Sequence, residues 1–347
     1  MIDITLRDAI ILFMGSIIGL LASDCLFGDI ILRFLKSMIK FPFKLLTWRY
    51  YDNKLNNTSE LSRFYDINQF QESRMAMNCN IDTYWMNFGY WEKRRDDKEG
   101  IIIISGIVIF PQACSRMAGK LAEAVNMQPG NRCLDIGFGC GDQDIWWHQH
   151  YGVDIIAVEV VPSQVAVAKR RVRDLGLEKR VQLMLGSADD LNFARATFDK
   201  IVSLDSAYHY RTREVFFSKA YALLRPGGSL GLIDFVFNNR KSSLLQELVK
   251  TCASKFFLVP KANMVSMDTY ALQMKSAGFC NVRIVDLSEH VFNGFYEYSV
   301  NQYKRYSGLI APRAFIQLRL VGMAIKFVGR YTNIKCILAT GDKLSSK

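Results

Sequence analysis

The chain has 347 residues, a hydrophobic fraction of 50% and no low-complexity tract or internal repeat, which together exclude a disordered protein. Its net charge of +11 indicates an anionic partner. Its eight cysteines form no Cys-x-x-Cys pair and have no histidine at ligand spacing, which indicates reduced thiols and no bound metal.

Residues 1–50 are predicted to associate with a membrane. The 15 uncharged residues 9–23 would form a helix too short to cross a bilayer, whereas residues 30–50 carry five basic residues and no acid. Four of these bases recur at spacings of three and four and therefore share one helix face. We expect a hydrophobic hairpin or a dipping helix, followed by a basic helix on a surface of anionic lipids. Two core-packing helices or a single tilted span are the alternatives.

The rest of the chain divides into a cap and a larger domain. Residues 51–130 are expected to form an N-terminal cap with helices on the substrate side. Within this cap, the ten-residue apolar run 101–110 either lines an entrance or belongs to an ordinary core. Residues 131–347 are expected to form the main domain, with a helical insertion at about 291–332. The part of this insertion that begins at Pro312 is amphipathic, and we expect either an interfacial helix or a lid that packs on the domain.

The main domain is predicted to have an α/β fold. From about residue 131 to residue 287, short apolar runs alternate with amphipathic stretches, which is typical of a parallel sheet with crossover helices. Strands are predicted at residues 132–136, 155–159, 181–185, 200–204 and 229–235. Helices are predicted at residues 143–150, 163–175 and 213–224. Two further strands, 282–286 and 334–340, would form an antiparallel edge, so we expect a Rossmann-like seven-stranded, mostly parallel sheet with helices on both faces.

A glycine-rich turn follows the first of these strands. The segment LDIGFGCGDQ places Asp135 at the end of the strand and three glycines, Gly137, Gly139 and Gly141, in the turn to the next helix. Glycines at alternate positions let the backbone turn tightly and let a ligand approach where no Cβ stands in the way. The N-terminus of the helix supplies unpaired N–H donors for that ligand.

Two acidic residues indicate which ligand this turn holds. A dinucleotide-binding turn carries glycine where this chain has Asp142, and a negative charge beside a pyrophosphate is unfavourable. Glu159 lies at the end of the next strand, where an acid accepts hydrogen bonds from the hydroxyls of a ribose. The pattern therefore predicts a nucleoside cofactor that carries no phosphate.

With this order of strand, glycines, helix, strand and acid, the chain resembles the class I methyltransferases that depend on S-adenosylmethionine (SAM). Residues 186–189 resemble the family segment that contacts the adenine. Residues 198–203 resemble the fourth strand of the family, and residues 224–228 resemble the turn before its fifth strand. The resemblance implies SAM as the cofactor and S-adenosylhomocysteine as its product.

An aromatic segment upstream of the glycines, Tyr84–Trp91, extends the resemblance. It is similar to a segment of methyltransferases that act on sterols, prenylated quinones, tocopherols and lipid-like natural products, where it helps to close over the cofactor. Aromatic faces attract a sulfonium cation without offering a nucleophile; an aromatic core cluster is the alternative. The residues that the whole resemblance implies for cofactor binding are Asp135, Gly137, Gly139, Gly141, Gln143, Glu159, Ala188, Asp189, Tyr90 and Trp91.

The segment after the fourth predicted strand is where a catalytic base would project, because ligands bind at the carboxyl ends of strands in open α/β sheets. Methyl transfer is an in-line displacement that needs a base only if the acceptor must lose a proton. His209 is the first candidate because the ordinary pKa of histidine is near 6.5, and Asp205, Tyr208 and Tyr210 follow it. The alternative is that His209 only shapes the pocket.

Taken together, these features predict a membrane-associated SAM-dependent methyltransferase that acts on a hydrophobic small molecule, such as a sterol, another isoprenoid, a quinone or a lipid. We expect it on an intracellular membrane, that of the endoplasmic reticulum, with the catalytic domain facing the cytosol. The alternatives are a soluble natural-product or protein methyltransferase and a non-catalytic scaffold protein with the SAM-binding fold. The intact glycines and Glu159 argue against a scaffold, and the core offers no basic aromatic groove for a nucleic acid.

Overall fold

The computed structural model describes residues 61–62, 65–66, 77–78, 82–92, 110–237, 250, 254, 257–306, 312–331 and 333–345. All of them belong to the unit Leu55–Lys347. The predicted membrane-associating segment 1–50 and residues 101–109 of the apolar run lie outside the described residues. Within the described ranges, no helix combines the length and the apolar character that crossing a bilayer requires.

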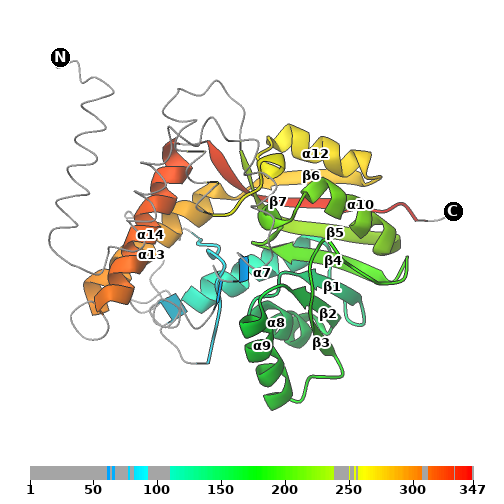
Figure 1. The fold of residues 1–347 in the computed structure, drawn as a ribbon, viewed down its shortest axis with the longest axis horizontal. Coiled ribbons are helices and arrows are strands. Elements are labelled where there is room, and N and C mark those ends of the chain that lie inside the picture. Colours follow the sequence, from blue (N-terminus) through cyan, green and yellow to red (C-terminus); the bar gives the residue numbers. More distant parts are fainter. Residues whose placement is uncertain are drawn as a thin grey trace. The chain divides into compact units, whose positions relative to one another are not determined.

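A seven-stranded mixed sheet organises the fold, in the order β3-β2-β1-β4-β5-β7-β6 (Figure 1). The strands are β1 Arg132–Ile136, β2 Asp154–Glu159, β3 Val181–Leu185, β4 Phe198–Leu204, β5 Leu224–Phe237, β6 Cys280–Asp286 and β7 Ile334–Asp342. Strands β1 to β5 are parallel, and β7 is antiparallel to both β5 and β6. The predicted Rossmann-like sheet with an antiparallel edge is confirmed. The chain order reverses between β1 and β4, and this is the point where ligands bind in such sheets.

Helices cover both faces of the sheet, as predicted. The helices are α7 Phe110–Ala124, α8 Asp142–Tyr151, α9 Pro162–Asp174, α10 Arg213–Leu223, α12 Met267–Ser276, α13 Gly294–Tyr306 and α14 Pro312–Tyr331. One hydrophobic cluster joins α7, α8 and α9 to Cys133 of β1, and a second joins α10 and α12 to Leu134 and Ile136 of the same strand. Alternate residues of β1 therefore belong to opposite layers, as the pleat of a strand requires.

Local residue chemistry sets the ends of the helices that frame the site. Helix α8 begins directly after Gly141 and ends at Gly152, whose φ angles of 81° and 64° lie in the left-handed region that favours glycine. The side chain of Thr212 caps α10 by accepting a hydrogen bond from the amide of Val215. Strand β5 begins at Leu224 instead of the predicted residue 229, because Leu224 already pairs with β4 before a register shift.

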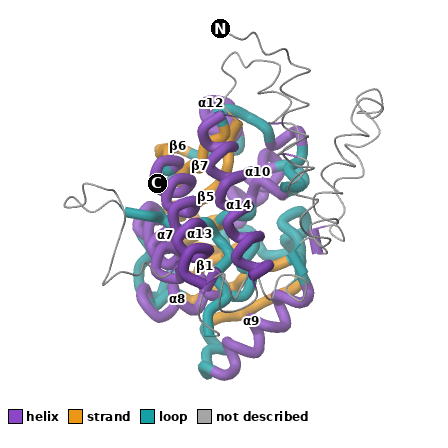
Figure 2. The backbone as a smooth tube through the Cα atoms, turned by 90° about the vertical axis from the view of Figure 1, so that its left-hand side faces the viewer, coloured by secondary structure: helices purple, strands orange, loops and turns teal. Residues whose placement is uncertain are grey.

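Helices α13 and α14 fill the connection between β6 and β7 and lie side by side (Figure 1, Figure 2). A π-helical turn, Glu289–Asn293, leads into α13. The side chains of Phe315, Leu318 and Ile325 in α14 are buried, whereas Val321, Met323 and Phe327 are exposed. The described part of α14 therefore packs on the domain along one face, which agrees with the lid alternative.

Candidate active site

The glycine turn between β1 and α8 needs glycine at all three of its predicted positions. Gly137, Gly139 and Gly141 have φ angles of 86°, 61° and 81°, which L side chains rarely adopt. A Cβ at Gly137 would collide with the side chain of Ser206. A Cβ at Gly139 would meet Met86 at 3.5 Å and Gln164 at 3.8 Å, which is ordinary van der Waals contact, so this position requires glycine because of its φ angle.

Glu159 is buried at the end of β2 and is bound to the glycine turn. Its Oε2 accepts a hydrogen bond from the amide of Gly139 at 3.0 Å, and its Oε1 accepts from the amides of Val160 and Val161 at 2.8 and 3.0 Å. Burial raises the pKa of Glu159 above its ordinary value, while these three amides act in the opposite direction. The side chain predicted to bind ribose is thus held rigidly beside the turn.

Asp135 and Gln143 lie behind the same turn. Asp135 is fully buried, and its Oδ2 accepts a hydrogen bond from Nε2 of Gln143 at 2.7 Å. Burial raises the pKa of Asp135 to about 7. The glycine turn, Asp135 and Gln143 therefore come together as predicted, joined by Glu159.

The predicted adenine segment lies at the same edge of the sheet. The amide of Gly186 donates to the backbone oxygen of Glu159 at 3.0 Å, which places the loop after β3 next to the ribose candidate. Ala188 in this loop is buried and Asp189 is exposed. The backbone oxygen of Asp189 accepts a hydrogen bond from Nζ of Lys219.

The aromatic residues Tyr90 and Trp91, which are predicted to contact the cofactor, pack against the helical insertion. Tyr90 stacks on the ring of His290, with 4.6 Å between ring centroids. Trp91 packs 5.2 Å from Tyr298 of α13 and donates from Nε1 to the backbone oxygen of Phe88 at 2.8 Å. The two ring contacts are thus made with the π-helical turn and with α13. Contact of either residue with the cofactor stays a prediction.

Asp142 is paired, and the charge argument based on it is wrong. Its two carboxylate oxygens lie 2.8 Å from Nη1 and Nη2 of Arg171 on α9, and its Oδ1 also accepts from the amide of Tyr84 at 3.0 Å. The guanidinium lies 4.9 Å from the centre of the Tyr84 ring. Arg171 therefore neutralises the charge that was expected to repel a phosphate. The pair instead fastens the aromatic segment to α8 and α9.

His209 lies in a 3₁₀ turn after β4, and its ring is bonded on both sides. Its Nε2 lies 2.7 Å from the hydroxyl of Tyr65, and its Nδ1 lies 3.4 Å from the backbone oxygen of Leu258. Burial lowers the pKa of His209 from 6.5 to about 4, so the ring is neutral near pH 7. Because a carbonyl oxygen only accepts, Nδ1 carries the proton and Tyr65 donates to Nε2.

Tyr208 and Asp205 continue this arrangement away from the histidine. The ring of Tyr208 packs against the ring of His209, with 4.1 Å between the centroids, and Asp205 is an electrostatic neighbour of Tyr208. Burial raises the pKa of Asp205 to about 8. Asp205, Tyr208, Tyr65 and His209 therefore form one chain of interacting side chains, in which Tyr65 and His209 are joined by a hydrogen bond.

Two residues outside this chain keep its backbone in place. Tyr210, the last of the predicted candidates, donates its hydroxyl to the backbone oxygen of Ile136 at 2.9 Å and therefore ties the turn to β1. The side-chain amide of Asn263 donates through Nδ2 to the backbone oxygens of Tyr208 and Tyr210, at 3.1 and 2.7 Å. Neither Tyr65 nor Asn263 could be predicted from the sequence, because no local pattern around either residue indicates a site.

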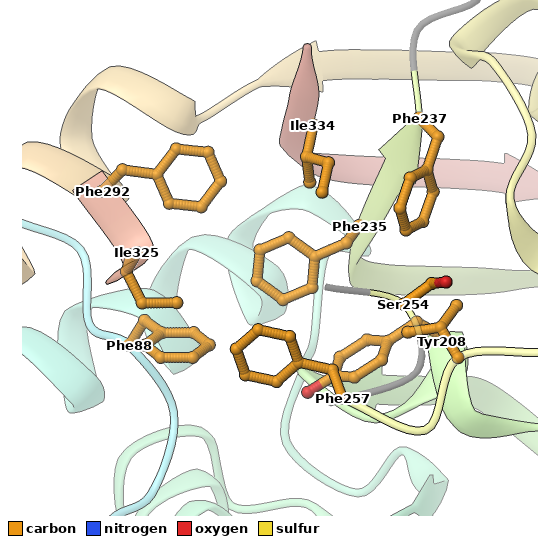
Figure 3. A pocket seen from close by; sticks show the side chains of 10 residues that line it. Phe88, Tyr208, Phe235, Phe237, Ser254, Phe257, Phe292, Ile325 and Ile334 are labelled. Atoms are coloured by element: carbon orange, nitrogen blue, oxygen red, sulfur yellow. The ribbon is translucent and has the colours of Figure 1, made fainter. Parts of the chain in front are cut away.

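A largely apolar pocket opens beside Tyr208 at the carboxyl ends of β4 and β5 (Figure 3). The empty volume of this pocket is about 440 Å³, which includes space that is open to solvent. It is lined by Phe88, Tyr208, Phe235, Phe237, Ser254, Phe257, Val259, Phe292, Ile325 and Ile334. The π-helical turn and α14 each contribute one of these residues, so the helical insertion forms part of the wall. No charged side chain belongs to this lining of described residues.

The comparison with known proteins accounts for this combination of sheet, glycine turn and pocket. The model of the mycolic acid cyclopropane synthetase family matches residues 110–311. The chain belongs to this family. It is a SAM-dependent methyltransferase, as the resemblance of its motifs implied, and SAM is its cofactor.

Three relatives show the range of molecules that similar enzymes methylate. Erythromycin 3''-O-methyltransferase of Saccharopolyspora erythraea is 32% identical over 62% of this chain and 68% of its own length. The 27-O-demethylrifamycin SV methyltransferase of Amycolatopsis mediterranei is 26% identical over 60% and 73% of the two chains. The crystal structure of geranyl diphosphate C-methyltransferase from Streptomyces coelicolor, which contains S-adenosyl-L-homocysteine, has a TM-score of 0.65 and 18% identity, covering 83% of this chain and 98% of that one. The last similarity shows the fold alone.

The predicted location on the endoplasmic reticulum is wrong. The erythromycin and rifamycin relatives are natural-product methyltransferases from bacteria, which have no endoplasmic reticulum. The described ranges also contain no helix that fits a membrane span. The apolar and basic pattern of the N-terminal segment was therefore an insufficient basis for assigning an organelle.

Proposed function

We propose that this methyltransferase transfers the methyl group of SAM to a hydroxyl oxygen of an uncharged, hydrophobic small molecule of the natural-product type. The observation that carries the proposal is the position of Tyr208, which lines the apolar pocket and packs its ring 4.1 Å from the ring of His209, measured between centroids. A neutral base thus lies next to a cavity suited to an apolar acceptor. The names of the erythromycin and rifamycin relatives support oxygen as the acceptor atom.

The cofactor would bind across the glycine turn. Glu159 would accept hydrogen bonds from the ribose hydroxyls, since each carboxylate oxygen has more than one lone pair. The backbone at Gly137, Gly139 and Gly141 would allow close approach, and Asp135 with Gln143 would face the methionine end. Ala188 and Asp189 would contact the adenine, because their loop is bonded to Glu159.

The residues of the chain can provide what an oxygen acceptor needs. SAM supplies an electrophilic methyl group when it is bound. The hydroxyl oxygen of Tyr65 accepts the proton of the acceptor hydroxyl while Tyr65 passes its own proton to Nε2 of His209, which lies 2.7 Å away. Tyr208 packs against the ring of His209. The aromatic wall of the pocket excludes water from the reacting oxygen.

The pocket lining also restricts the class of acceptor. A phosphate group requires basic side chains or helix N-termini to replace its hydration. The described lining contains one serine and one tyrosine hydroxyl among otherwise apolar side chains. A neutral acceptor therefore fits this cavity better than a phosphorylated one such as geranyl diphosphate. We therefore propose a natural-product acceptor in place of the sterol, quinone or membrane lipid that was first expected. The proposal includes no membrane surface.

The test is a panel of methyl acceptors offered with SAM, with release of S-adenosylhomocysteine as the readout. Neutral hydrophobic alcohols and phenols should be methylated, and their phosphate esters should not. His209→Ala should lower kcat by about a hundredfold or more, since general-base catalysis contributes about that much. His148→Ala is the control, because His148 bonds to the backbone oxygen of Val153 and has no part in the chain of side chains that ends at His209. Turnover of phosphorylated acceptors alone would contradict the proposal.

A further inference from the structure

Two buried carboxyl groups meet behind the glycine turn. Asp135 ends β1, and Asp144 is the third residue of α8; both side chains are completely inaccessible to solvent. The two carboxyl groups are electrostatic neighbours, and each acts on the pKa of the other. Gln143 donates to Oδ2 of Asp135, but Oδ1 of Asp135 and both carboxyl oxygens of Asp144 receive no donor from the described residues.

Buried carboxyl oxygens without a donor, on two neighbouring side chains, imply a proton that the heavy atoms do not show. Two carboxylates side by side in an apolar environment cannot both be ionised, because burial and their mutual repulsion both favour the neutral form. A single proton between Asp135 and Asp144 would give these oxygens a donor and an acceptor. The pKa values agree with this, since burial, followed by the charge of Asp135, raises the pKa of Asp144 well above its ordinary range.

Among the described residues, no further side chain donates to the pair. The titratable groups that interact with it are Asp142 on α8, Glu159 on β2, the thiol of Cys133 on β1 and Tyr210, whose hydroxyl donates to the backbone oxygen of Ile136. Helix α7, which packs on α8, contributes the Cys114 thiol, and this donates to the backbone oxygen of Asn87. The guanidinium of Arg171 is bonded to Asp142.

We propose that Asp144 is a positioning residue that holds Asp135 through one shared proton, so that the pair presents a single negative charge behind the cofactor turn. Bound SAM carries two positive groups and one carboxylate, and a pair with one net negative charge balances it. Two ionised carboxylates would instead repel each other and loosen the start of α8. The inference rests on the proposed cofactor site, although the sharing of the proton can be measured without the cofactor.

Asp144→Asn and Asp144→Leu separate the two roles of this residue. The amide of the Asn variant donates permanently to Asp135, while the Leu variant removes the donor and keeps a side chain of similar size. Asp174→Asn, at an exposed position of α9, is the matched control for a change from carboxyl to amide. Thermal unfolding midpoints without SAM should be compared between about pH 5 and about pH 9, where proton linkage of a raised carboxyl pKa is visible.

The sign follows from the raised pKa in the folded state. Stability that depends on the retained proton is present at low pH and is lost as the pH rises through the folded-state pKa. The unfolding midpoint of Asp144→Asn should equal that of the wild-type protein near about pH 5. As the pH rises, the midpoint of the variant should become progressively higher than that of the wild-type protein. For Asp174→Asn, the difference in unfolding midpoint from the wild-type protein should not change with pH. If the difference for Asp144→Asn did not change with pH either, the shared proton would be overturned.

Calorimetry with SAM at neutral pH tests the positioning role. Asp144→Asn should bind SAM within about threefold of the wild-type affinity, while Asp144→Leu should bind about tenfold more weakly, as expected when one buried hydrogen bond to a charged group is lost. Equal losses in both variants would overturn positioning through a donor. If the wild-type protein did not bind SAM, the cofactor site would fail, while the unfolding profiles would still decide whether the proton is shared.

Discussion

The hydroxyl of Tyr65 lies 2.7 Å from Nε2 of His209, although the two residues are 144 positions apart in the chain. Their rings meet edge to face, with 5.3 Å between centroids. This pair joins a segment from before the glycine turn to the loop after β4. It determines which nitrogen of His209 is available to accept a proton, and the following predictions depend on this geometry.

Removing the Tyr65 hydroxyl should impair catalysis without impairing cofactor binding. Tyr65→Phe keeps the ring but leaves Nε2 of His209 without its donor, so kcat should fall by about tenfold, the effect of one buried hydrogen bond. Isothermal titration should give an unchanged dissociation constant for SAM. Unaltered kcat in this variant would show that the chain from Asp205 to His209 has no part in the reaction.

The pH dependence of kcat/KM should reflect the lowered pKa of His209. The neutral ring is the base, and its pKa of about 4 keeps it neutral well below the ordinary value of 6.5. Activity should therefore persist as the pH falls from neutral through about 6 and decline only towards about 4, provided that the fold persists. Circular dichroism at each pH controls for unfolding. A loss of activity centred near about 6.5 would mean that His209 titrates as an exposed histidine.

Glu159→Gln should weaken SAM binding by about ten- to a hundredfold, because an amide offers the ribose one accepting oxygen and loses the charge. The single oxygen of Gln can accept from Val160 and Val161 or from Gly139 but not from all three, so circular dichroism should confirm that the variant is folded. Glu178→Gln, at an exposed position before β3, is the matched control and should bind SAM normally. Binding of SAM with equal affinity by both variants would remove Glu159 from the cofactor site.

Breaking the buried ion pair beneath the catalytic turn should destabilise the protein. Nη1 of Arg213 lies 2.8 Å from Oδ2 of Asp234, with 1% and 0% of their side chains exposed. Arg213→Met should lower the free energy of unfolding by about 3–5 kcal/mol, because it leaves a buried charge without its partner. The comparison variant is Arg225→Met, which breaks the partly exposed pair with Asp199 and should cost under about 1 kcal/mol. Urea denaturation that ranks the two variants in the opposite order would contradict this account.

The strands and the cofactor turn could be predicted because their signals are local. The bounds of β1 and β3 agree with the predicted ranges 132–136 and 181–185, since short apolar runs there end at glycines or polar residues. Gly141 indicates the start of α8 in the same way. Spacing along the chain was therefore enough to bring Asp135 and Glu159 to one edge of the sheet.

The pocket and the pairing of charges could not be predicted because they depend on contacts between distant segments. Phe292 lines the pocket and Phe295 lies in the core, yet nothing in the sequence around them distinguishes these two roles. The charge of Asp142 was misjudged because Arg171, its partner, lies 29 positions away on another helix. The contact between Tyr65 and His209 could not be predicted for the same reason, because 144 positions separate the two residues.

The central claim is transfer of a methyl group to oxygen in the pocket beside His209. The most direct test supplies SAM with a deuterated methyl group to the wild-type protein and to His209→Ala, together with an extract of hydrophobic small molecules, and identifies labelled products by mass spectrometry. The account predicts a deuterated methyl ether that the wild-type protein forms and the variant forms at a rate about a hundredfold lower. Label found only on carbon or nitrogen, or equal formation of the ether by both proteins, would contradict it.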